Sequence, residues 1–494
     1  MSDLGDAPRR SDDALTVGLD VGTSGLKAVA TSRDGAVVAE ASASYPLHVP
    51  QPGWTEQSAD DWWEAAASAL RELTDRVGAD RVKAVAPSGQ MHGLVALDAA
   101  GDPVRPAILW NDQRTGSEVA RIEAAVPRDE LVRRTGNPAV TGFQLPKLLW
   151  LREHEPERFE RTRSVLFPKD WIAVKLGAEA YAEPTDASGS GAFAIATGGW
   201  DDALLERLDL DPRLFPPLVP SDAVVGSVSA AAADATGLRP GTPIVAGAGD
   251  NAAAATALGL GRDAPDLGSI SLGTSGVLFA TVPRPTPDPL GRVHLFAHAD
   301  GGWTLLGVTL AAAGSLAWWL SVLAPGDDVG DRVERALARP PGAGGVTFTP
   351  FLAGERSPFL APSLRGGFAG LSLATEADDL VRAVLEGVVF SLADVWSVMR
   401  PLGAPDRLLA TGGGARGHGW VQLAADVLDV EIGLPEHVPG AAHGAAALAW
   451  RALDHDVPAP AIERWLTPRP SPALREAYVR YREHAPPLDA VGRD

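Results

Sequence analysis

Two short stretches of the chain nearly repeat each other, LDVGTSGLKAV at residues 19–29 and ISLGTSGVLFA at residues 270–280. In each stretch an apolar run leads into Gly-Thr-Ser-Gly and apolar residues follow, which is the pattern of two β-strands joined by a tight turn. The two copies lie about half of the 494-residue chain apart. A chain of this length exceeds the size at which one hydrophobic core keeps growing, so the repetition predicts two domains of similar construction.

The sequence around each copy predicts alternating strands and helices, and therefore an α/β protein. Each half is expected to contain a hairpin, a helix and a glycine-rich turn that opens a further helix. The expected helices include residues 58–77, 146–160, 309–323 and 418–428. We expect a disordered extension at 1–13, an N-terminal domain at 14–246 and a C-terminal domain at 247–494.

Composition narrows the class of protein. The formal net charge of −20 at pH 7 disfavours a nucleic-acid partner, because phosphate backbones are bound by basic surfaces. The sequence contains no cysteine, which excludes disulfides, thiolate zinc sites and cysteine nucleophiles. No apolar run is long enough to span a bilayer, and the first residues do not have the apolar core of a signal peptide. We therefore expect a cytoplasmic protein without a membrane partner.

The repeated Gly-Thr-Ser-Gly loop does not match three better-known glycine motifs. A Walker loop needs a lysine after its last glycine, and a dinucleotide fingerprint needs G-x-G-x-x-G between a strand and a helix. In a serine nucleophile elbow the last glycine would come one residue later. Two interpretations remain: a plain β-turn, or a hairpin turn whose converging backbone N–H groups and hydroxyls bind phosphate oxygens. Two phosphate loops in one protein would together hold a nucleoside triphosphate.

Further motifs in the same order give the chain a resemblance to the FGGY family of carbohydrate kinases. The matching segments are GLDVGTSGLK (18–27), SGQMHG (88–93), AILWNDQR (107–114), PKLLW (146–150), PKDW (168–171), GAGDNAAAA (247–255), SLGTSGV (271–277), GERSP (354–358) and TGGGAR (411–416). The resemblance implies the two-lobed, actin-like (ribonuclease H-like) ATPase fold, in which duplicated domains with mixed sheets and flanking helices hold ATP in the cleft between them. It assigns sugar binding and one phosphate loop to the N-terminal domain, and nucleotide binding to the C-terminal domain.

Two aspartates are the candidate catalytic residues. Asp250 follows a glycine-rich turn and precedes an alanine-rich stretch, so the residues alone allow either a helix cap or a base. The resemblance implies that Asp250 is the general base and that Asn251 contacts a sugar hydroxyl. Asp20 stands at the end of an apolar strand where the second loop has Leu272. A Mg²⁺ ion on the ATP phosphates explains this carboxylate; the alternative is a hydrogen bond to amides of its own turn.

The expected substrate is a ketopentose. The resemblance implies sugar contacts from Gln90, Met91, His92, Trp110, Asp112 and Asn251. The Met-His pair favours a ketopentose, because glycerol kinases have an Arg-Glu pair at this place. Both this pair and the segment from Trp110 to Arg114 could instead be structural. The expected reaction is ATP-dependent phosphorylation of D-xylulose to D-xylulose 5-phosphate. The alternatives are a kinase for ribulose, gluconate, glycerol or another polyol, and a non-kinase ATPase of the actin or Hsp70 type.

The expected nucleotide site draws on three segments. By resemblance, ATP contacts the two loops and the glycine-rich turn, at Thr23, Ser24, Lys27, Gly273, Thr274, Ser275, Gly413 and Gly414. Arg356 either lies in a surface turn or helps to hold phosphate. The expected partners are thus a small sugar, ATP and Mg²⁺, and a homodimer is compatible with the resemblance.

Overall fold

The computed structural model describes residues 13–323, 326 and 328–491. The chain divides into two compact units, each described here by itself. The first contains the chain up to Gly259 together with Ala297–Gly301 and Pro439–Ala459, and the second contains the remainder. Except for Asp13, the disordered extension expected at 1–13 lies outside the described residues. No helix in the described ranges is long and apolar enough to cross a membrane.

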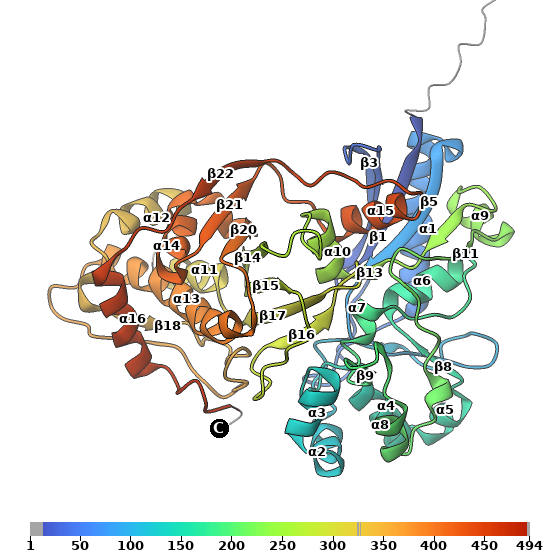
Figure 1. The fold of residues 1–494 in the computed structure, drawn as a ribbon, viewed down its shortest axis with the longest axis horizontal. Coiled ribbons are helices and arrows are strands. Elements are labelled where there is room, and N and C mark those ends of the chain that lie inside the picture. The colour runs from blue at the N-terminus through green and yellow to red at the C-terminus, as the bar shows by residue number, and fades with distance from the viewer. Residues whose placement is uncertain (1–12, 324–325, 327, 492–494) are drawn as a thin grey trace, which may run out of the picture. The chain divides into compact units, whose positions relative to one another are not determined.

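The first unit is built on a mixed sheet with the strand order β11-β12-β5-β1-β2-β3, and β13 also pairs with β5 (Figure 1). Strands β1, β2 and β3 are antiparallel neighbours, whereas β5 runs parallel to β1 and β12 runs parallel to β5. The strands of this unit are β1 (Leu15–Val21), β2 (Gly25–Thr31), β3 (Val37–Ser44), β4 (Glu56–Gln57), β5 (Val82–Gly89), β6 (Val95–Leu97), β7 (Ala107–Ile108), β8 (Ser164–Leu166), β9 (Phe193–Ala194), β10 (Gly199–Trp200), β11 (Val224–Ser227), β12 (Pro243–Val245) and β13 (Ala248–Gly249).

Helices cover both faces of this sheet. The helices of this unit are α1 (Ala59–Val77), α2 (Gly116–Ala125), α3 (Arg128–Thr135), α4 (Gln144–His154), α5 (Pro156–Arg161), α6 (Pro168–Leu176), α7 (Pro184–Ala187), α8 (Asp202–Arg207), α9 (Ala230–Thr236), α10 (Asp250–Ala257) and α15 (Ala441–Arg451). Side chains of β5 point alternately to the two faces, so Val85 packs in the core with α1 and α6 while Ala84 and Ala86 pack against α15. A central strand covered on both sides explains why β1 is apolar nearly throughout.

Helix α15 joins the first unit although it lies close to the C-terminus in sequence. It packs so closely on β1 that a Cβ atom on Gly18 would lie 1.8 Å from the carbonyl oxygen of Ala442. The hydroxyl of Thr16 donates a hydrogen bond of 2.9 Å to the carbonyl of Ala446. The division into units therefore differs from the domain boundary expected between 246 and 247, because both α10 and α15 belong to the first unit.

The second unit contains a sheet with the order β16-β17-β15-β14-β20-β21-β22. Its strands are β14 (Gly268–Leu272), β15 (Gly276–Val282), β16 (His294–Ala297), β17 (Trp303–Thr309), β18 (Thr347–Thr349), β19 (Gly367–Ala369), β20 (Arg407–Thr411), β21 (Glu431–Pro435) and β22 (Ile462–Leu466). Its helices are α11 (Ala313–Leu323), α12 (Val329–Ala338), α13 (Ala377–Met399), α14 (His418–Leu428) and α16 (Pro472–His484). The long α13 is buried along most of its length and forms the centre of this unit.

The two sheets repeat one arrangement. In the first, the antiparallel strands β3, β2 and β1 are followed by the parallel strands β5 and β12. In the second, β17, β15 and β14 are antiparallel and are followed by the parallel strands β20 and β21. The two Gly-Thr-Ser-Gly loops thus join equivalent strand pairs, β1 to β2 and β14 to β15. The expected class, two α/β domains with mixed sheets and flanking helices, is confirmed.

Candidate active site

Asp20 and Asp250 lie at the same edge of the first sheet. Strands β1, β5 and β13 are parallel neighbours, and Asp20 pairs with Ser88, which pairs on its other side with Ala248. Because parallel strands end at a common edge, this register brings the end of β1, the segment after β5 and the start of α10 together. Burial, and after it the nearby charge of Asp20, raise the pKa of Asp250 to about 7. Burial also raises the pKa of Asp20 to about 6.

The carboxylate of Asp250 does not cap its helix. The N-cap residue of α10 is Gly249, and no side chain makes a capping hydrogen bond there. Instead, Oδ1 of Asp250 accepts hydrogen bonds from the backbone N–H of Asn251 at 2.7 Å and from its side-chain amide at 2.9 Å. The same amide nitrogen lies 3.9 Å from the sulfur of Met91. Asp250, Asn251 and Met91 therefore form one group of side chains.

Asp20 has an unsatisfied oxygen. Its Oδ1 is buried and has no hydrogen-bond partner among the described residues, so amides of its own turn do not bind it. A buried carboxylate oxygen without a donor is costly unless a cation binds it. The described residues contain no group of three metal-ligating side chains, but Mg²⁺ commonly takes one or two carboxylates and completes its shell with phosphates and water. The chemistry of Asp20 fits that requirement.

The raised pKa of Asp250 predicts a pH-dependent effect on stability. Between about pH 4 and pH 7 the folded protein keeps a proton that the unfolded chain releases, so this group lowers stability as pH rises through that interval. Asp250→Asn removes the penalty, and we expect a gain of about 1–2 kcal/mol at pH 8, allowing for partial exposure. Near pH 4 we expect no gain. Urea unfolding at both pH values measures this, and an equal gain at both would exclude the carboxylate charge as the cause.

The first Gly-Thr-Ser-Gly loop is fixed by a hydrogen bond within the loop and by hydrogen bonds from side chains outside it. The N–H of Gly22 donates to the carbonyl of Gly25 at 3.1 Å, and the hydroxyl of Tyr45 donates to the carbonyl of Gly22 at 2.6 Å. The side-chain amide of Gln57 donates to the carbonyl of Thr23 at 2.7 Å. The backbone N–H groups of Thr23 and Ser24 are engaged by no residue in the described ranges. They remain available as donors.

The glycines of this loop are explained by space and not by an unusual backbone conformation. Neither Gly22 nor Gly25 has a positive φ, so the loop does not need glycine for an unusual backbone conformation. A Cβ on Gly25 would instead lie 2.8 Å from the carbonyl oxygen of Ala43 on β3. Close strand packing explains Gly25. Lys27, expected to contact ATP, forms an exposed ion pair of 2.7 Å with Glu40 in this structure.

Trp110 and Gln90 connect this loop to the expected sugar site. The indole N–H of Trp110 donates to Oγ1 of Thr23 at 3.1 Å, and that hydroxyl donates to Oε1 of Gln90 at 3.4 Å. The amide of Gln90 donates in turn to Gln57 at 2.9 Å. Gln90 is buried, and its side chain is used in these contacts with the loop. The side chain of Trp110 is 40% exposed, so part of its aromatic ring faces solvent. These contacts make Gln90 a support for the loop.

His92 has a left-handed backbone that other residues stabilise. Its φ is 68°, an uncommon value for a residue with a side chain. The buried ammonium of Lys147 donates to the carbonyls of His92 at 2.9 Å and of Gly142 at 2.7 Å. The imidazole Nδ1 lies 2.8 Å from the carbonyl of Gly189, and the ring packs on Phe143. The turn at Met91 and His92 is therefore rigidly placed beside α10.

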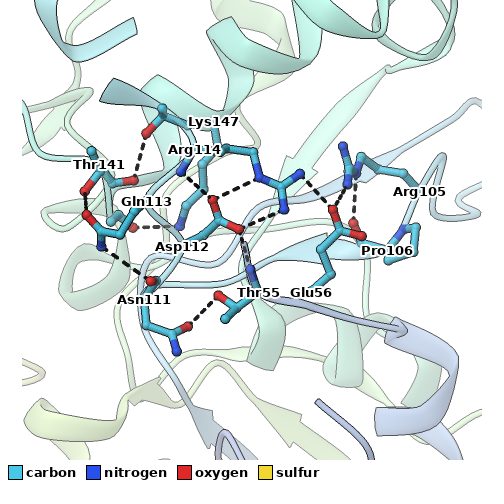
Figure 2. A network of polar contacts seen from close by, with 12 residues as sticks. Thr55, Glu56, Arg105, Pro106, Asn111, Asp112, Gln113, Arg114, Thr141 and Lys147 are labelled. Atoms are coloured by element: carbon cyan, nitrogen blue, oxygen red, sulfur yellow. Dashed lines mark hydrogen bonds and ion pairs between the residues drawn. The ribbon is translucent and has the colours of Figure 1, made fainter. Parts of the chain in front are cut away.

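Asp112 lies inside a buried ionic network, shown in Figure 2. Its Oδ1 accepts from the backbone and side chain of Arg114, both at 2.9 Å. Its Oδ2 accepts from Arg114 at 2.8 Å and from the N–H of Thr55 at 2.6 Å. The Arg114 guanidinium also lies over the rings of Trp54 and Trp150 and pairs with Glu56. These hydrogen bonds fix Asp112 in place, so that it holds the segment next to Trp110. Direct contact between Asp112 and the sugar stays a prediction.

The second unit brings its own expected site residues together. The carbonyls of Gly273 and Thr274 accept hydrogen bonds from Ala313 and Ala312 at 2.8 and 2.9 Å, which fixes the second loop on the start of α11. Gly412, with φ of 82°, lies against this loop, because a Cβ there would be 2.9 Å from the nitrogen of Gly273. The Gly273–Ser275 loop and the Gly413–Gly414 turn are thus neighbours.

A pocket of about 790 Å³ opens beside these glycines. It lies between α11, α12, α14 and the turn at Gly413–Arg416, and its walls are mainly apolar. Leu316, Leu320 and Leu337 line it together with Gly413, Gly414 and Trp420. The volume and the apolar walls suit a flat heteroaromatic ring, and the glycines allow close approach of a ligand.

Three residues that hold the site had no signal in the sequence. Gln57, Tyr45 and Lys147 donate hydrogen bonds to the carbonyls of Thr23, Gly22 and His92, which lie far away in the chain. A pattern of residue types does not reveal such partners. The PKLLW motif (146–150) marked the segment of Lys147 without indicating what its ammonium contacts.

Comparison with known proteins agrees with this construction. Residues 15–259 match the N-terminal domain of the FGGY family of carbohydrate kinases, and residues 268–453 match its C-terminal domain. The chain belongs to this family. It is 38% identical over 441 residues to xylulose kinase of Escherichia coli K12, covering 88% of this chain and 89% of that protein.

Solved structures show the same fold. The ligand-bound xylulose kinase of Lactobacillus acidophilus superposes with a TM-score of 0.89 at 25% identity, covering 95% of this chain and 97% of that one. A gluconate kinase from the same organism gives 0.89 at 26% identity with the same coverage. The fold alone therefore does not distinguish the two sugars.

Proposed function

We propose that the protein phosphorylates D-xylulose to D-xylulose 5-phosphate with ATP. The observation that carries the proposal is the group formed by Asp250, Asn251 and Met91, in which burial and the charge of Asp20 raise the pKa of Asp250 to about 7. A general base is most effective when its pKa lies near the working pH. The similarity to a xylulose kinase over most of both chains supports the choice of sugar.

In this reaction Asp250 accepts the proton of the terminal hydroxyl of the sugar. The hydroxyl oxygen bonds to the γ-phosphorus of ATP, the bond from that phosphorus to the bridging oxygen breaks, and ADP leaves. Asn251 and the turn at Met91–His92 orient the sugar, with Trp110 as an aromatic face. Asp20 would hold Mg²⁺, which neutralises charge on the phosphates when bound. The free N–H groups of Thr23 and Ser24 would donate to phosphate oxygens.

In the second unit, we assign the apolar pocket at Gly413–Gly414 to adenine and the Gly273–Ser275 loop to phosphate oxygens. Arg356 supplies a cation in this unit. Its guanidinium lies 2.9 Å from Nε2 of His294, and no carboxylate in the described ranges pairs with it. Burial lowers the pKa of Arg356. A partly buried cation without a carboxylate is stabilised by a bound anion, so we assign Arg356 to a phosphate group of ATP or of the product.

Filling the apolar pocket should weaken ATP binding selectively. Ala317 lies on α11, lines the pocket and is exposed, so Ala317→Phe adds a ring to the pocket without disturbing the core. We expect the KM for ATP to rise about tenfold or more, corresponding to ~1.4 kcal/mol, with little change in the KM for the sugar. Steady-state kinetics with either substrate varied measure this. Ala338→Phe, at an exposed alanine of α12 outside the pocket, is the control, and an equal rise in that variant would contradict the assignment.

A coupled assay of ADP release tests the proposed function. The panel contains D-xylulose, ribulose, gluconate and glycerol, with a reaction that lacks sugar. We expect the highest kcat/KM with D-xylulose, and product analysis should identify the 5-phosphate. A higher kcat/KM with gluconate would identify gluconate as the substrate in place of D-xylulose. Fast ATP hydrolysis without sugar would favour the ATPase interpretation. With a sugar and ATP as substrates we place the reaction in the cytoplasm, and the homodimer stays a prediction.

A further inference from the structure

A cluster of charged side chains lies buried next to the segment that carries Asp250, and the proposed chemistry does not use it. Lys169 and Asp170 of α6 and Glu183 and Asp186 at α7 are all completely buried. One ammonium therefore faces three carboxyl groups in the core of the first unit. Such groups are expensive to bury, so each must be bound by several donors or stay neutral.

Glu183 is the member of the cluster with the most hydrogen bonds. It accepts from the backbone N–H groups of Thr185 and Asp186 at 2.9 and 3.0 Å and thereby caps α7. It also accepts from the hydroxyls of Thr185 at 2.6 Å and Ser221 at 2.8 Å, and the ammonium of Lys169 lies 3.4 Å away. These donors fix the orientation of the Glu183 side chain.

The hydroxyl of Thr185 links this carboxylate to the backbone before Asp250. Its proton is donated to Oε1 of Glu183, so its lone pair is directed at the N–H of Gly249, which donates to it at 2.8 Å. Donation to a charged acceptor polarises a hydroxyl and strengthens the bond that it accepts. Gly249 immediately precedes Asp250, so the position of the base depends on this bond.

The same segment is also confined by packing. A Cβ on Gly247 would lie 1.7 Å from the carbonyl oxygen of Pro87 on β5. On Gly249 it would lie 2.7 Å from Cγ of Met91 and 3.2 Å from Oδ1 of Asp186. Packing therefore leaves little room around Gly247 and Gly249, and the hydroxyl of Thr185 binds the N–H of Gly249 directly before Asp250.

We infer that Thr185, oriented by Glu183 and Lys169, is a positioning residue for Asp250. The inference rests on the proposed function, in which Asp250 accepts the proton of the sugar. Without the hydroxyl, the N–H of Gly249 loses its acceptor and the carboxylate of Asp250 shifts relative to Met91 and the bound sugar. Misplacement of a reacting group by about 1 Å can lower a rate by about 10²-fold without removing any substrate contact.

Thr185→Val tests this inference because it keeps the shape of the side chain and removes only the hydroxyl. We expect kcat to fall by roughly 10- to 100-fold, with the KM values for ATP and sugar changed by less than about threefold. Thr185→Ser restores the hydroxyl and should recover kcat to within about threefold of the unmodified protein. In a protein that already carries Asp250→Asn, adding Thr185→Val should not lower the residual rate further, because Thr185 acts through Asp250.

Thr236→Val is the matched control. Thr236 is also completely buried in the first unit and its hydroxyl donates to a backbone carbonyl, that of Ala232 at 2.7 Å, but it lies on α9. We expect it to lower thermal stability as Thr185→Val does, while kcat is retained. Equal losses of kcat in both variants, an unchanged kcat in Thr185→Val or a further loss in the Asp250→Asn protein would overturn the inference.

Two provisions keep this test separate from the test of function. If the valine variant does not fold, Thr185→Ala removes the hydroxyl without replacing the methyl groups, and the same outcomes apply. The rates are taken with whichever sugar the panel shows to be phosphorylated, so a different sugar changes the substrate and leaves the comparison intact. If no sugar is phosphorylated, the proposed function fails. Hydrogen exchange of the Gly249 amide then tests only whether the hydroxyl of Thr185 holds this amide. We expect faster exchange in Thr185→Val than in the unmodified protein.

Discussion

Replacing Asp250 by alanine should lower kcat by at least the ~10²–10⁴-fold that a general base contributes. The loss arises because the sugar hydroxyl must give up its proton as it bonds to phosphorus, and Asp250 is the group that we assign to accept this proton. ATP binding should be retained, since the nucleotide contacts that we assign lie elsewhere. Single-turnover rates at saturating xylulose and ATP, together with calorimetric titration of an ATP analogue, measure the two effects separately.

Asp60→Ala is the control for this experiment. Asp60 is an exposed aspartate in the first turn of α1 and makes no contact with the candidate site. We expect its kcat to equal that of the unmodified protein. If Asp250→Ala turns over xylulose at nearly the same rate as this control, Asp250 is not the base.

The repeated loops were sufficient to predict two hairpins in two domains of similar construction. An apolar run, Gly-Thr-Ser-Gly and a second apolar run occur twice, and each pair became adjacent antiparallel strands at equivalent positions of a mixed sheet. The helix expected at 418–428 was also confirmed as α14. Local periodicity and turn chemistry are properties of neighbouring residues, so they can be read from the sequence.

Element boundaries and distant packing could not be read in this way. The helix expected at 146–160 is two helices, because Pro156 lacks the N–H needed to continue α4 and starts α5 instead. The helix expected at 309–323 starts only at Ala313, since the preceding residues complete β17. The place of α15 on β1 depends on contacts across most of the chain, and its alanine-rich sequence would pack equally well on many apolar surfaces.

The candidate site likewise contains residues that could be predicted from the sequence and residues that could not. Asp250 was predicted from the resemblance, and Asp20 from its place opposite Leu272 in the two loops. The structure adds that both lie at one edge of the first sheet. The supporting residues could not be predicted, because Thr185 differs from other threonines only in where its hydroxyl points. For Asp112, the residue type was compatible with both sugar binding and an internal ion pair, and only the structure reveals how many donors already bind it.

The metal dependence of Asp20 is the second large effect. Asp20→Asn keeps the size of the side chain but weakens the oxygen ligand that we assign to Mg²⁺. We expect the half-saturating Mg²⁺ concentration to rise about tenfold or more and the maximum rate to fall, while sugar binding is retained. A magnesium titration of the initial rate at fixed ATP measures both quantities, and calorimetry measures sugar binding.

Leu272→Asn provides the comparison because Leu272 holds the equivalent position before the second loop. It is a buried apolar residue at the end of β14, so an amide there loses apolar packing and lacks a partner. That variant should be less stable, and its folded fraction should respond to Mg²⁺ as the unmodified protein does. The contrast follows from Oδ1 of Asp20, which is buried without a hydrogen-bond partner in the described chain and so lacks a ligand that a cation on the phosphates would supply. If Asp20→Asn shows the half-saturation and maximum rate of the unmodified protein, Asp20 does not hold the metal.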